Sequence, residues 1–143
     1  MKLTSMELID GSALDLRHGK KFENVPPQLG WMGAPPETES FLLALVDIHP
    51  DAQGYVHWVV DQIPAPVGEM PAGGPVVGRE LTPYTGPCPP SGTHEYVFTL
   101  YALDGSAPLL PANSTLHDAL AQLDGHVLAT ASLSGSFTTP DRQ

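Results

Sequence analysis

Two apolar stretches on either side of one short turn constrain the fold of this chain more than any other feature. Phe41–His49 is almost continuously apolar, which is typical of a central strand that is buried on both faces. Pro50 ends this stretch, because proline has no N–H group to donate to a neighbouring strand. After the turn at Asp51–Gly54, Tyr55–Ile63 is rich in β-branched and aromatic residues. The sequence therefore predicts a tight β-hairpin.

Four further segments are predicted to be extended or to form strands. His94–Leu103 alternates cleanly between apolar and other residues, which predicts a strand with one face of apolar and aromatic side chains. The residues on that face are Tyr96, Phe98, Leu100 and Ala102. Lys2–Ile9 and His126–Ser134 alternate more loosely and predict a first and a last strand. The prolines of Asn24–Trp31 predict an extended segment.

One helix is predicted late in the chain. Asn113 or Ser114 can cap it, and Thr115 with Asp118 resembles a capping box. Apolar residues recur at helical spacing before a stop at Gly125, namely Leu116, Ala119, Leu120 and Leu123. Strands dominate, and the 16 prolines and 14 glycines fit a turn-rich chain. The sequence predicts a mainly β single domain over residues 1–143, a β-sandwich with a peripheral helix.

The segment Pro64–Pro90 is predicted to be a long loop without secondary structure. It holds eight prolines and five glycines. Loops longer than about 12–15 residues inside a compact domain are usually functional or disordered. Because this one leads directly into the polar residues before the strand at His94, we expect it to serve function.

The charge balance excludes some classes of partner. The chain carries 16 acidic and 6 basic residues, for a formal net charge of -10. A field of this sign repels nucleic acids and anionic membranes, so we expect neither as a partner. The N-terminal residues lack the apolar stretch of a signal peptide, and no segment approaches the roughly 18 apolar residues of a spanning helix. We therefore expect a cytoplasmic location and no stable membrane insertion.

Titratable side chains gather where the predicted strands begin and end. His49 and Asp51 flank Pro50 after one strand, His57 lies in the next, and His94 and Tyr96 share a face at a spacing of two. If the strands of His57 and His94 are neighbours, both imidazoles and the Tyr96 hydroxyl face one cavity. Such a cluster suits an anion.

The sequence contains four motifs that lie in a recognisable order. They are His49-Pro-Asp-Ala, His57-Trp-Val-Val, Gly86-Pro-x-Pro-Pro-x-Gly-x-His94-x-Tyr96 and Gly125-His-Val-Leu-Ala. Together with Asn24–Trp31 they resemble the phosphatidylethanolamine-binding protein family, in its bacterial Raf-kinase-inhibitor-like branch. The resemblance implies a Greek-key β-sandwich with one or two peripheral helices and a pocket for phosphate-type anions. The anion-binding residues that it implies here are His49, Asp51, His57, Gly92, His94 and Tyr96.

The chain departs from the family pattern at three positions. His49 stands where the family has the first aspartate of Asp-Pro-Asp, Gln53 stands where a proline is usual, and Glu95 replaces the arginine of His-Arg-Tyr. An imidazole donates hydrogen bonds directly and becomes cationic near neutral pH. We therefore expect His49 to make the pocket less negative by about one charge. Glu95 alternates away from the pocket and is expected to face solvent.

Three functions remain open from the sequence. The first is a non-catalytic binding protein without a cofactor, for phosphate, a phosphorylated small molecule or a phosphorylated headgroup, with regulation as one role. The second is an inhibitor of a kinase or protease that uses residues 64–90 to bind a protein partner. The third is a divalent-metal protein or enzyme that uses His49, Asp51, His57 and His94. A homodimer is compatible with the resemblance.

The remaining candidate residues are not assigned a role in function. Cys88 has no second cysteine to pair with and is predicted to be structural or incidental. No Gly-x-Ser-x-Gly motif surrounds Ser91, which argues against a nucleophile there. His18, His117 and His126 belong to no cluster and are expected to be surface or structural residues.

Overall fold

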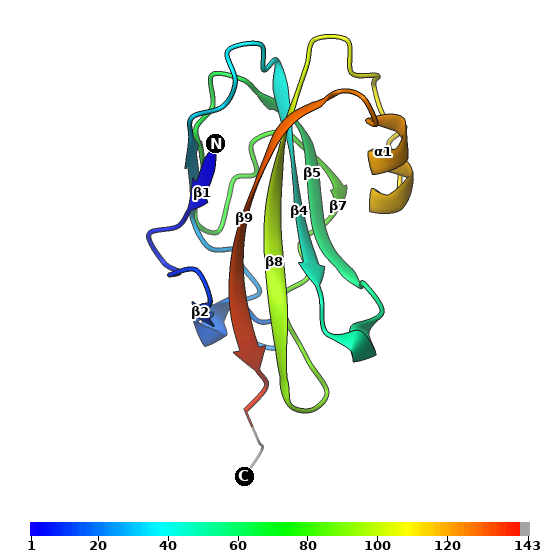
Figure 1. The fold of residues 1–143 in the computed structure, drawn as a ribbon. Coiled ribbons are helices and arrows are strands. Elements are labelled where there is room, and N and C mark those ends of the chain that lie inside the picture. Colours follow the sequence, from blue (N-terminus) through cyan, green and yellow to red (C-terminus); the bar gives the residue numbers. More distant parts are fainter. Residues whose placement is uncertain (141–143) are drawn as a thin grey trace.

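The fold is a sandwich of two β-sheets with one α-helix (Figure 1), seen in a computed structural model that describes residues 1–140. The large sheet has six strands. Their spatial order is β2 (Ser12–Ala13), β9 (Val127–Thr138), β8 (Thr93–Leu103), β4 (Ser40–Asp47), β5 (Val56–Pro64) and β7 (Arg79–Thr82). The small sheet consists of β1 (Lys2–Thr4), β3 (Leu29–Met32) and β6 (Glu69–Met70). The predicted mainly β sandwich is confirmed.

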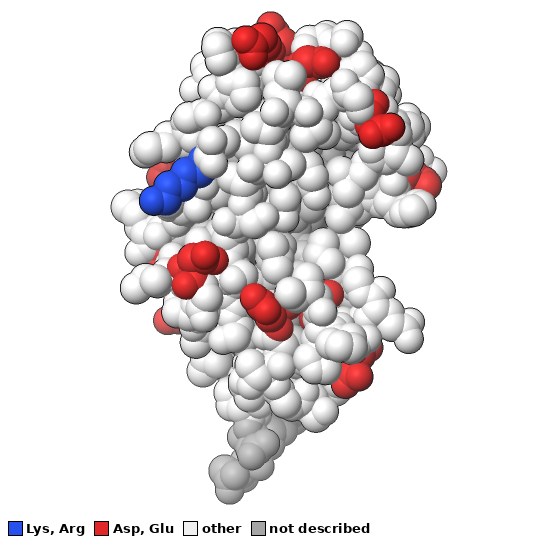
Figure 2. Space-filling model, viewed as in Figure 1, with Lys and Arg blue, Asp and Glu red and all other residues white. Residues whose placement is uncertain are grey.

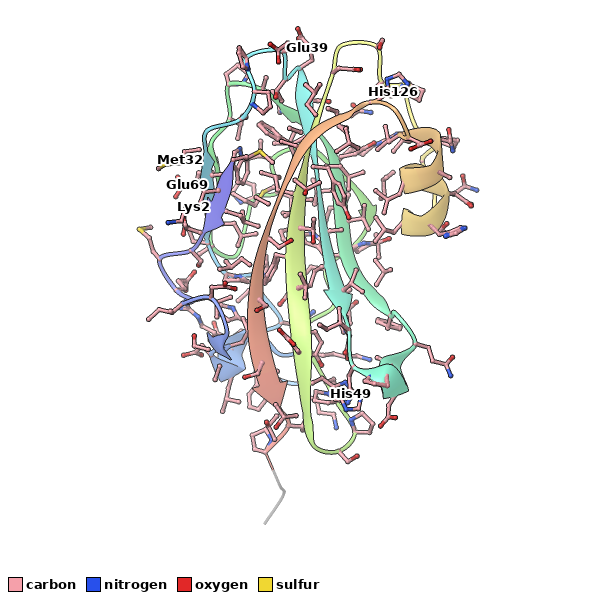
Figure 3. The ribbon with its side chains drawn as sticks, viewed as in Figure 1. Lys2, Met32, Glu39, His49, Glu69 and His126 are labelled. Atoms are coloured by element: carbon pink, nitrogen blue, oxygen red, sulfur yellow. The ribbon has the colours of Figure 1, made fainter. Side chains whose placement is uncertain are left out.

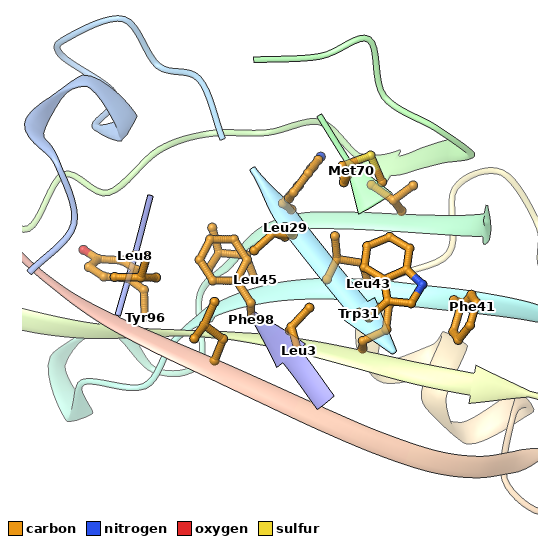
Figure 4. Packing of buried hydrophobic residues seen from close by; sticks show 14 of the residues in the cluster. Leu3, Leu8, Leu29, Trp31, Phe41, Leu43, Leu45, Met70, Tyr96 and Phe98 are labelled. Carbon is orange, nitrogen blue, oxygen red and sulfur yellow. The ribbon is translucent and has the colours of Figure 1, made fainter. Parts of the chain in front are cut away.

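The main core fills the space between the two sheets (Figure 4). Leu3, Leu29 and Trp31 of the small sheet pack in one buried cluster with side chains of the large sheet. The large sheet contributes Phe41, Leu43, Leu45, Trp58, Tyr96, Phe98 and Leu100, among others. Burial of this apolar surface is the main favourable contribution to folding.

The predicted central hairpin is confirmed, and its apolar sequence is explained by burial on both faces. β4 pairs antiparallel with β5 on one side and with β8 on the other. Alternate residues of β4, such as Leu43, belong to the core between the sheets, whereas Leu42 and Ala44 belong to a second cluster. That second cluster packs against Ala119 and Leu123, in and just after the helix α1 (Leu116–Gln122). Pro50 begins the short 3-10 helix η2 (Pro50–Ala52) after β4 ends.

The prediction that Pro64–Pro90 lacks secondary structure is wrong. The segment contains β6 and β7, which pair with β3 and β5 respectively. Strands of two and four residues at sheet edges are too short to show an alternating pattern, and the many prolines hid them.

The first predicted strand is too long, and the last is too short. β1 ends at Thr4, and Met6 and Ile9 are 82% and 80% exposed. The backbone leaves the sheet there because the N–H of Met6 donates to Oε1 of Gln28, at 2.8 Å. At the other end of the chain, β9 pairs with β8 as far as Thr138.

The cap of the predicted helix is Thr115. Its hydroxyl accepts the backbone N–H of Asp118 at 3.1 Å, as the capping-box pattern predicted. Ser114 is not the cap, because its hydroxyl donates to the carbonyl oxygen of Pro111. A further 3-10 helix, η1 (Leu16–His18), lies early in the chain.

Candidate ligand-binding cavity

A cavity of about 430 Å³ lies where β4, β5 and β8 meet the loops at one end of the large sheet. Strand residues supply Asp47, His57, His94 and Tyr96, and the proline-rich segment before β8 supplies much of the apolar wall. The lining residues are Lys20, Asp47, Asp51, Ala52, Tyr55, His57, Thr85, Gly86, Cys88, Pro89, Pro90, His94 and Tyr96. Four predicted site residues, Asp51, His57, His94 and Tyr96, are therefore brought together.

His57 reaches the cavity because β5 contains a bulge at this position. Leu45 pairs with Trp58 and Val46 pairs with Val56, so that His57 is an extra residue on β5. A bulge changes the direction of a side chain, and both His57 and Trp58 are buried here. Nδ1 of His57 donates to the carbonyl oxygen of Thr85 at 2.6 Å.

The bond to Thr85 fixes the state of the His57 ring. Since the carbonyl oxygen only accepts, Nδ1 carries the hydrogen and Nε2 carries the lone pair of the neutral ring. Burial lowers the pKa of His57 below its ordinary value of 6.5, although the carbonyl of Thr85 and the Asp47 carboxylate oppose this shift. The free protein thus holds a neutral imidazole here at neutral pH.

His94 is held by a buried carboxylate. Asp47 lies opposite Tyr96 in the β4–β8 pairing, and His94 is the diagonal neighbour of Asp47 on the same face. Nδ1 of His94 donates to Oδ2 of Asp47 at 2.6 Å. The side chains of His94 and Asp47 are 4% and 5% exposed. The pair therefore lies at the buried base of the cavity.

Tyr96 supplies a hydroxyl group that stays protonated. Burial, and then the negative charge of Asp47, raise the pKa of Tyr96 well above its ordinary value. Its ring meets that of His57 edge to face, with 5.2 Å between centroids. Tyr96 is therefore a hydrogen-bond donor over the whole physiological pH range.

His49 and Gly92 are not among the residues that line the cavity. The ring of His49 stacks on that of His94, with centroids 3.9 Å apart and planes at 4°. Its Nδ1 accepts the backbone N–H of Asp51 at 3.1 Å, which caps η2 (Figure 3). Gly92 is exposed in the turn before β8, with a positive φ of 69°. Asp51 lies at the rim, and its side chain is 79% exposed.

Sequence reasoning missed Asp47, Lys20, Tyr55 and Thr85. A signal existed for Asp47, because a carboxylate in a strand buried on both faces needs a partner. Lys20 gave no signal, since it comes from a distant loop that is joined to the cavity wall by a hydrogen bond from its N–H to the carbonyl of Pro87. Cys88, predicted to be structural or incidental, also lines the cavity.

The charges around the cavity are mixed. Asp47 and Asp51 are acidic. Among residues 1–140, Lys20 is the one residue of the Lys or Arg type that lines the cavity. On the face shown in Figure 2, acidic side chains are scattered, whereas Lys or Arg is visible at one place. The cavity therefore has donors for an anion but also a buried negative charge at its base.

The other predicted histidines lie away from this cavity. His18 is buried and donates from Nδ1 to the carbonyl of Val25, and His126 contacts Asp104 at 3.0 Å. His117 is exposed on α1. Within residues 1–140, no group of three or more His, Cys, Asp or Glu side chains is arranged to hold a metal ion. In the same part of the chain, no helix has the length and apolarity to span a membrane.

Comparison with known proteins gives the same fold. The sequence profile described as phosphatidylethanolamine-binding protein matches residues 4–138. The UPF0098 protein of Methanothermobacter thermautotrophicus is 37% identical and covers 96% of this chain and 98% of its own length. UPF0098 protein YbhB of Escherichia coli is 34% identical and covers 96% of this chain and 100% of its own.

Two solved structures have the same fold as this chain. CT736 of Chlamydia trachomatis, described as a candidate homologue of phosphatidylethanolamine-binding protein, has a TM-score of 0.88 and 26% identity over 97% of both chains. YbcL of Escherichia coli, described as a member of the mammalian PEBP family, has a TM-score of 0.85 and 27% identity over 97% of this chain and 98% of its own.

The two-layer sandwich places this chain among β-sandwich proteins with the fold of phosphatidylethanolamine-binding protein (PEBP). The chain belongs to the phosphatidylethanolamine-binding protein family. The resemblance that its four motifs indicated is thereby confirmed.

Proposed function

We propose that this protein binds small phosphate-type anions or phosphorylated headgroups in the cavity, without catalysing a reaction. The observation that carries the proposal is the convergence of two imidazoles and a tyrosine hydroxyl. His57 and His94 are each fixed through Nδ1, and Tyr96 keeps its proton. Hydrogen bonds to an ionised ligand are roughly twice as strong as those between neutral groups.

Each cavity residue has a role in this proposal. His94 presents Nε2 to the anion and Tyr96 donates from its hydroxyl, while the neutral ring of His57 packs edge to face against Tyr96 and so positions it. Lys20 adds a positive charge at the rim, where its side chain is exposed. His49 stacks on the ring of His94 and caps the turn that carries Asp51, which lies at the rim, whereas Gly92 lies in the turn before β8. The family name of the relatives supports a phosphorylated headgroup as one ligand.

The non-catalytic role rests on the side chains around the cavity. Ser91 is exposed and does not line the cavity, and Cys88 sits in the wall without a hydrogen-bonded base among residues 1–140. A cytoplasmic location stays a prediction, since a Mycobacterium tuberculosis relative, 39% identical, is named as a candidate lipoprotein, LppC.

A protein partner at the cavity mouth is the second candidate function. Tyr55 lines the cavity, Ile48 follows the lining residue Asp47, and their side chains are 55% and 50% exposed respectively. Large apolar side chains at a rim suit contact with another protein. This hypothesis covers both an inhibitor of a kinase or protease and a homodimer.

Calorimetric titration tests the proposal. Purified protein is titrated with inorganic phosphate and with phosphoethanolamine at pH 6 and at pH 7.5. We expect binding to both, weaker at the higher pH, because a histidine ring whose Nδ1 hydrogen is already bonded donates from Nε2 only when it is protonated. His57→Ala and His94→Ala should each abolish binding, and His117→Ala, on the exposed face of α1, should leave it unchanged. Absence of binding by the native protein at both pH values would overturn the proposal and favour the protein partner.

A further inference from the structure

The buried Asp47–His94 pair restricts the protonation state in which an anion can bind in the cavity. Asp47 accepts two hydrogen bonds, from Nδ1 of His94 at 2.6 Å and from the N–H of His49 at 2.9 Å. A buried charge is strongly destabilising when it loses its partner, so these bonds persist. The hydrogen of the neutral His94 ring is thereby committed to Asp47, and Nε2 is left for the cavity.

A neutral His94 cannot donate to a ligand. Its Nε2 carries a lone pair, and the oxygens of a phosphate dianion carry lone pairs as well. Two hydrogen-bond acceptors in contact repel each other, and the low dielectric of a buried site strengthens this repulsion. A hydrogen bond between them requires one additional proton, either on Nε2 or on the ligand.

We propose that phosphate-type anions bind in this cavity together with one proton, which is held between Nε2 of His94 and the ligand and is stabilised by the carboxylate of Asp47. This inference rests on the proposed function and names the bound species. The complex contains one more proton than the separate protein and phosphate dianion. The complex therefore has the proton count of a neutral His94 ring plus a singly charged phosphomonoester, and Asp47 is the positioning residue.

His49 restricts which of the two stacked histidines can hold the additional proton. Its ring lies flat on His94 at 3.9 Å, and two stacked imidazolium cations would repel each other strongly. Nδ1 of His49 already accepts the N–H of Asp51, which requires a lone pair on that nitrogen. Of the two stacked rings, His94 is the one with a buried carboxylate against it, so His94 takes the charge.

The other titratable groups around His94 are less suited to take up a proton. Tyr96 already carries its proton, because burial raises the pKa of its hydroxyl group. His57 is disfavoured as a cation because burial lowers its pKa, and it lies against a carbonyl instead of a carboxylate. Asp51 and Lys20 lie at the rim, where solvent screens their charges.

The experiment measures how many protons the protein and ligand take up when they bind. Native protein is titrated with monoethyl phosphate at pH 8 in two buffers that differ in ionisation enthalpy, and the difference in heat gives the protons taken up. A phosphomonoester is mainly a dianion at pH 8, since its second pKa is about 6. We expect uptake of close to one proton at pH 8 and much less at pH 5.5, where the ligand already carries the proton.

Two variants test whether the Asp47 carboxylate is responsible for the proton uptake. Asp47→Asn keeps the shape of the side chain but removes the negative charge that faces Nδ1 of His94. We expect proton uptake at pH 8 to fall and affinity there to drop about tenfold more than at pH 5.5. Asp104→Asn makes the same change in the Asp104–His126 pair, which lies outside the cavity, and should keep the native proton count.

The outcomes separate this inference from the proposed function. Binding at pH 8 without proton uptake overturns the inference and leaves the proposed function intact. Tighter binding in Asp47→Asn with an unchanged proton count shows that Asp47 only repels the ligand, which also overturns it. No binding of monoethyl phosphate at either pH overturns both. If Asp47→Asn fails to fold, the proton count of the native protein decides alone.

Discussion

Gly86 has no room for a side chain. A Cβ added there would lie 2.0 Å from the carbonyl oxygen of His18 and 2.9 Å from backbone atoms of Gly19 and Lys20. Its N–H donates to Oδ1 of Asn24 at 2.7 Å. Gly86→Ala must therefore push apart the two walls of the cavity. We expect a loss of about 1–3 kcal/mol in the free energy of unfolding, measured with urea, together with weaker phosphate binding.

Gly68→Ala is the matched control for this substitution. The nearest atom to its added Cβ is the carbonyl oxygen of Trp31 at 3.5 Å, which is ordinary contact. We expect its stability to stay within about 0.5 kcal/mol of the native protein. Equal losses in the two variants would show that general backbone effects, and not the contact with His18, set the cost.

At the scale of elements, one ion pair fastens the edge strand β7 to β5. Nε and Nη2 of Arg79 donate to the two carboxylate oxygens of Asp61 at 2.9 and 2.6 Å, and Nη2 also donates to the carbonyl of Leu110. The Asp61 side chain is 6% exposed. Arg79→Met leaves that carboxylate buried without its partner, so we expect a loss of roughly 3–5 kcal/mol in chemical unfolding.

Two comparisons make this prediction specific. Adding Asp61→Leu to Arg79→Met removes the unpaired buried carboxylate and should recover most of the lost stability. Arg17→Met breaks the pair with Glu7, which is partly exposed, and should cost less than about 1 kcal/mol. A small loss in Arg79→Met, or no recovery in the double variant, would mean that water reaches Asp61 when the arginine is gone.

How far an element could be predicted depended on its length and its burial. β4 and β8 span eight and eleven residues and carry a regular apolar pattern, so the sequence identified both. β6 and β7 have two and four residues, and polar contacts such as Arg79–Asp61 hold β7 in place. Periodicity cannot reveal strands that depend on partners distant in the sequence.

The same limit applies at the scale of the whole molecule, where the cavity forms. The spacing of two between His94 and Tyr96 correctly predicted a shared face, because it depends only on strand geometry. The contact of Asp47 with His94 depends on the register of β4 against β8. The placement of Lys20 depends on a loop that packs against the segment around Pro87. Register and loop packing are set by the folded molecule, so neither residue was identified.

Two of the buried histidines, His18 and His57, should make the whole molecule sensitive to mild acid. Burial lowers the pKa of both His18 and His57 below the ordinary value of 6.5. The unfolded chain therefore binds more protons than the folded protein just below pH 6.5. Stability from these groups is complete above that pH and is lost as the pH falls toward the folded-state pKa values. Each histidine contributes a slope of up to about 1.4 kcal/mol per pH unit.

His18→Asn isolates one of these two contributions. Nδ1 of His18 donates to the carbonyl of Val25 at 2.8 Å, and Nε2 is buried without a partner within residues 1–140. The asparagine amide replaces the donor but does not titrate. In urea unfolding between pH 7.5 and pH 5, without ligand, we expect a shallower loss of stability in this variant than in the native protein. His117→Asn, at an exposed position, should keep the native slope. If both variants keep it, protonation of His18 does not limit stability in acid, and the sensitivity comes from His57 or from the carboxylates.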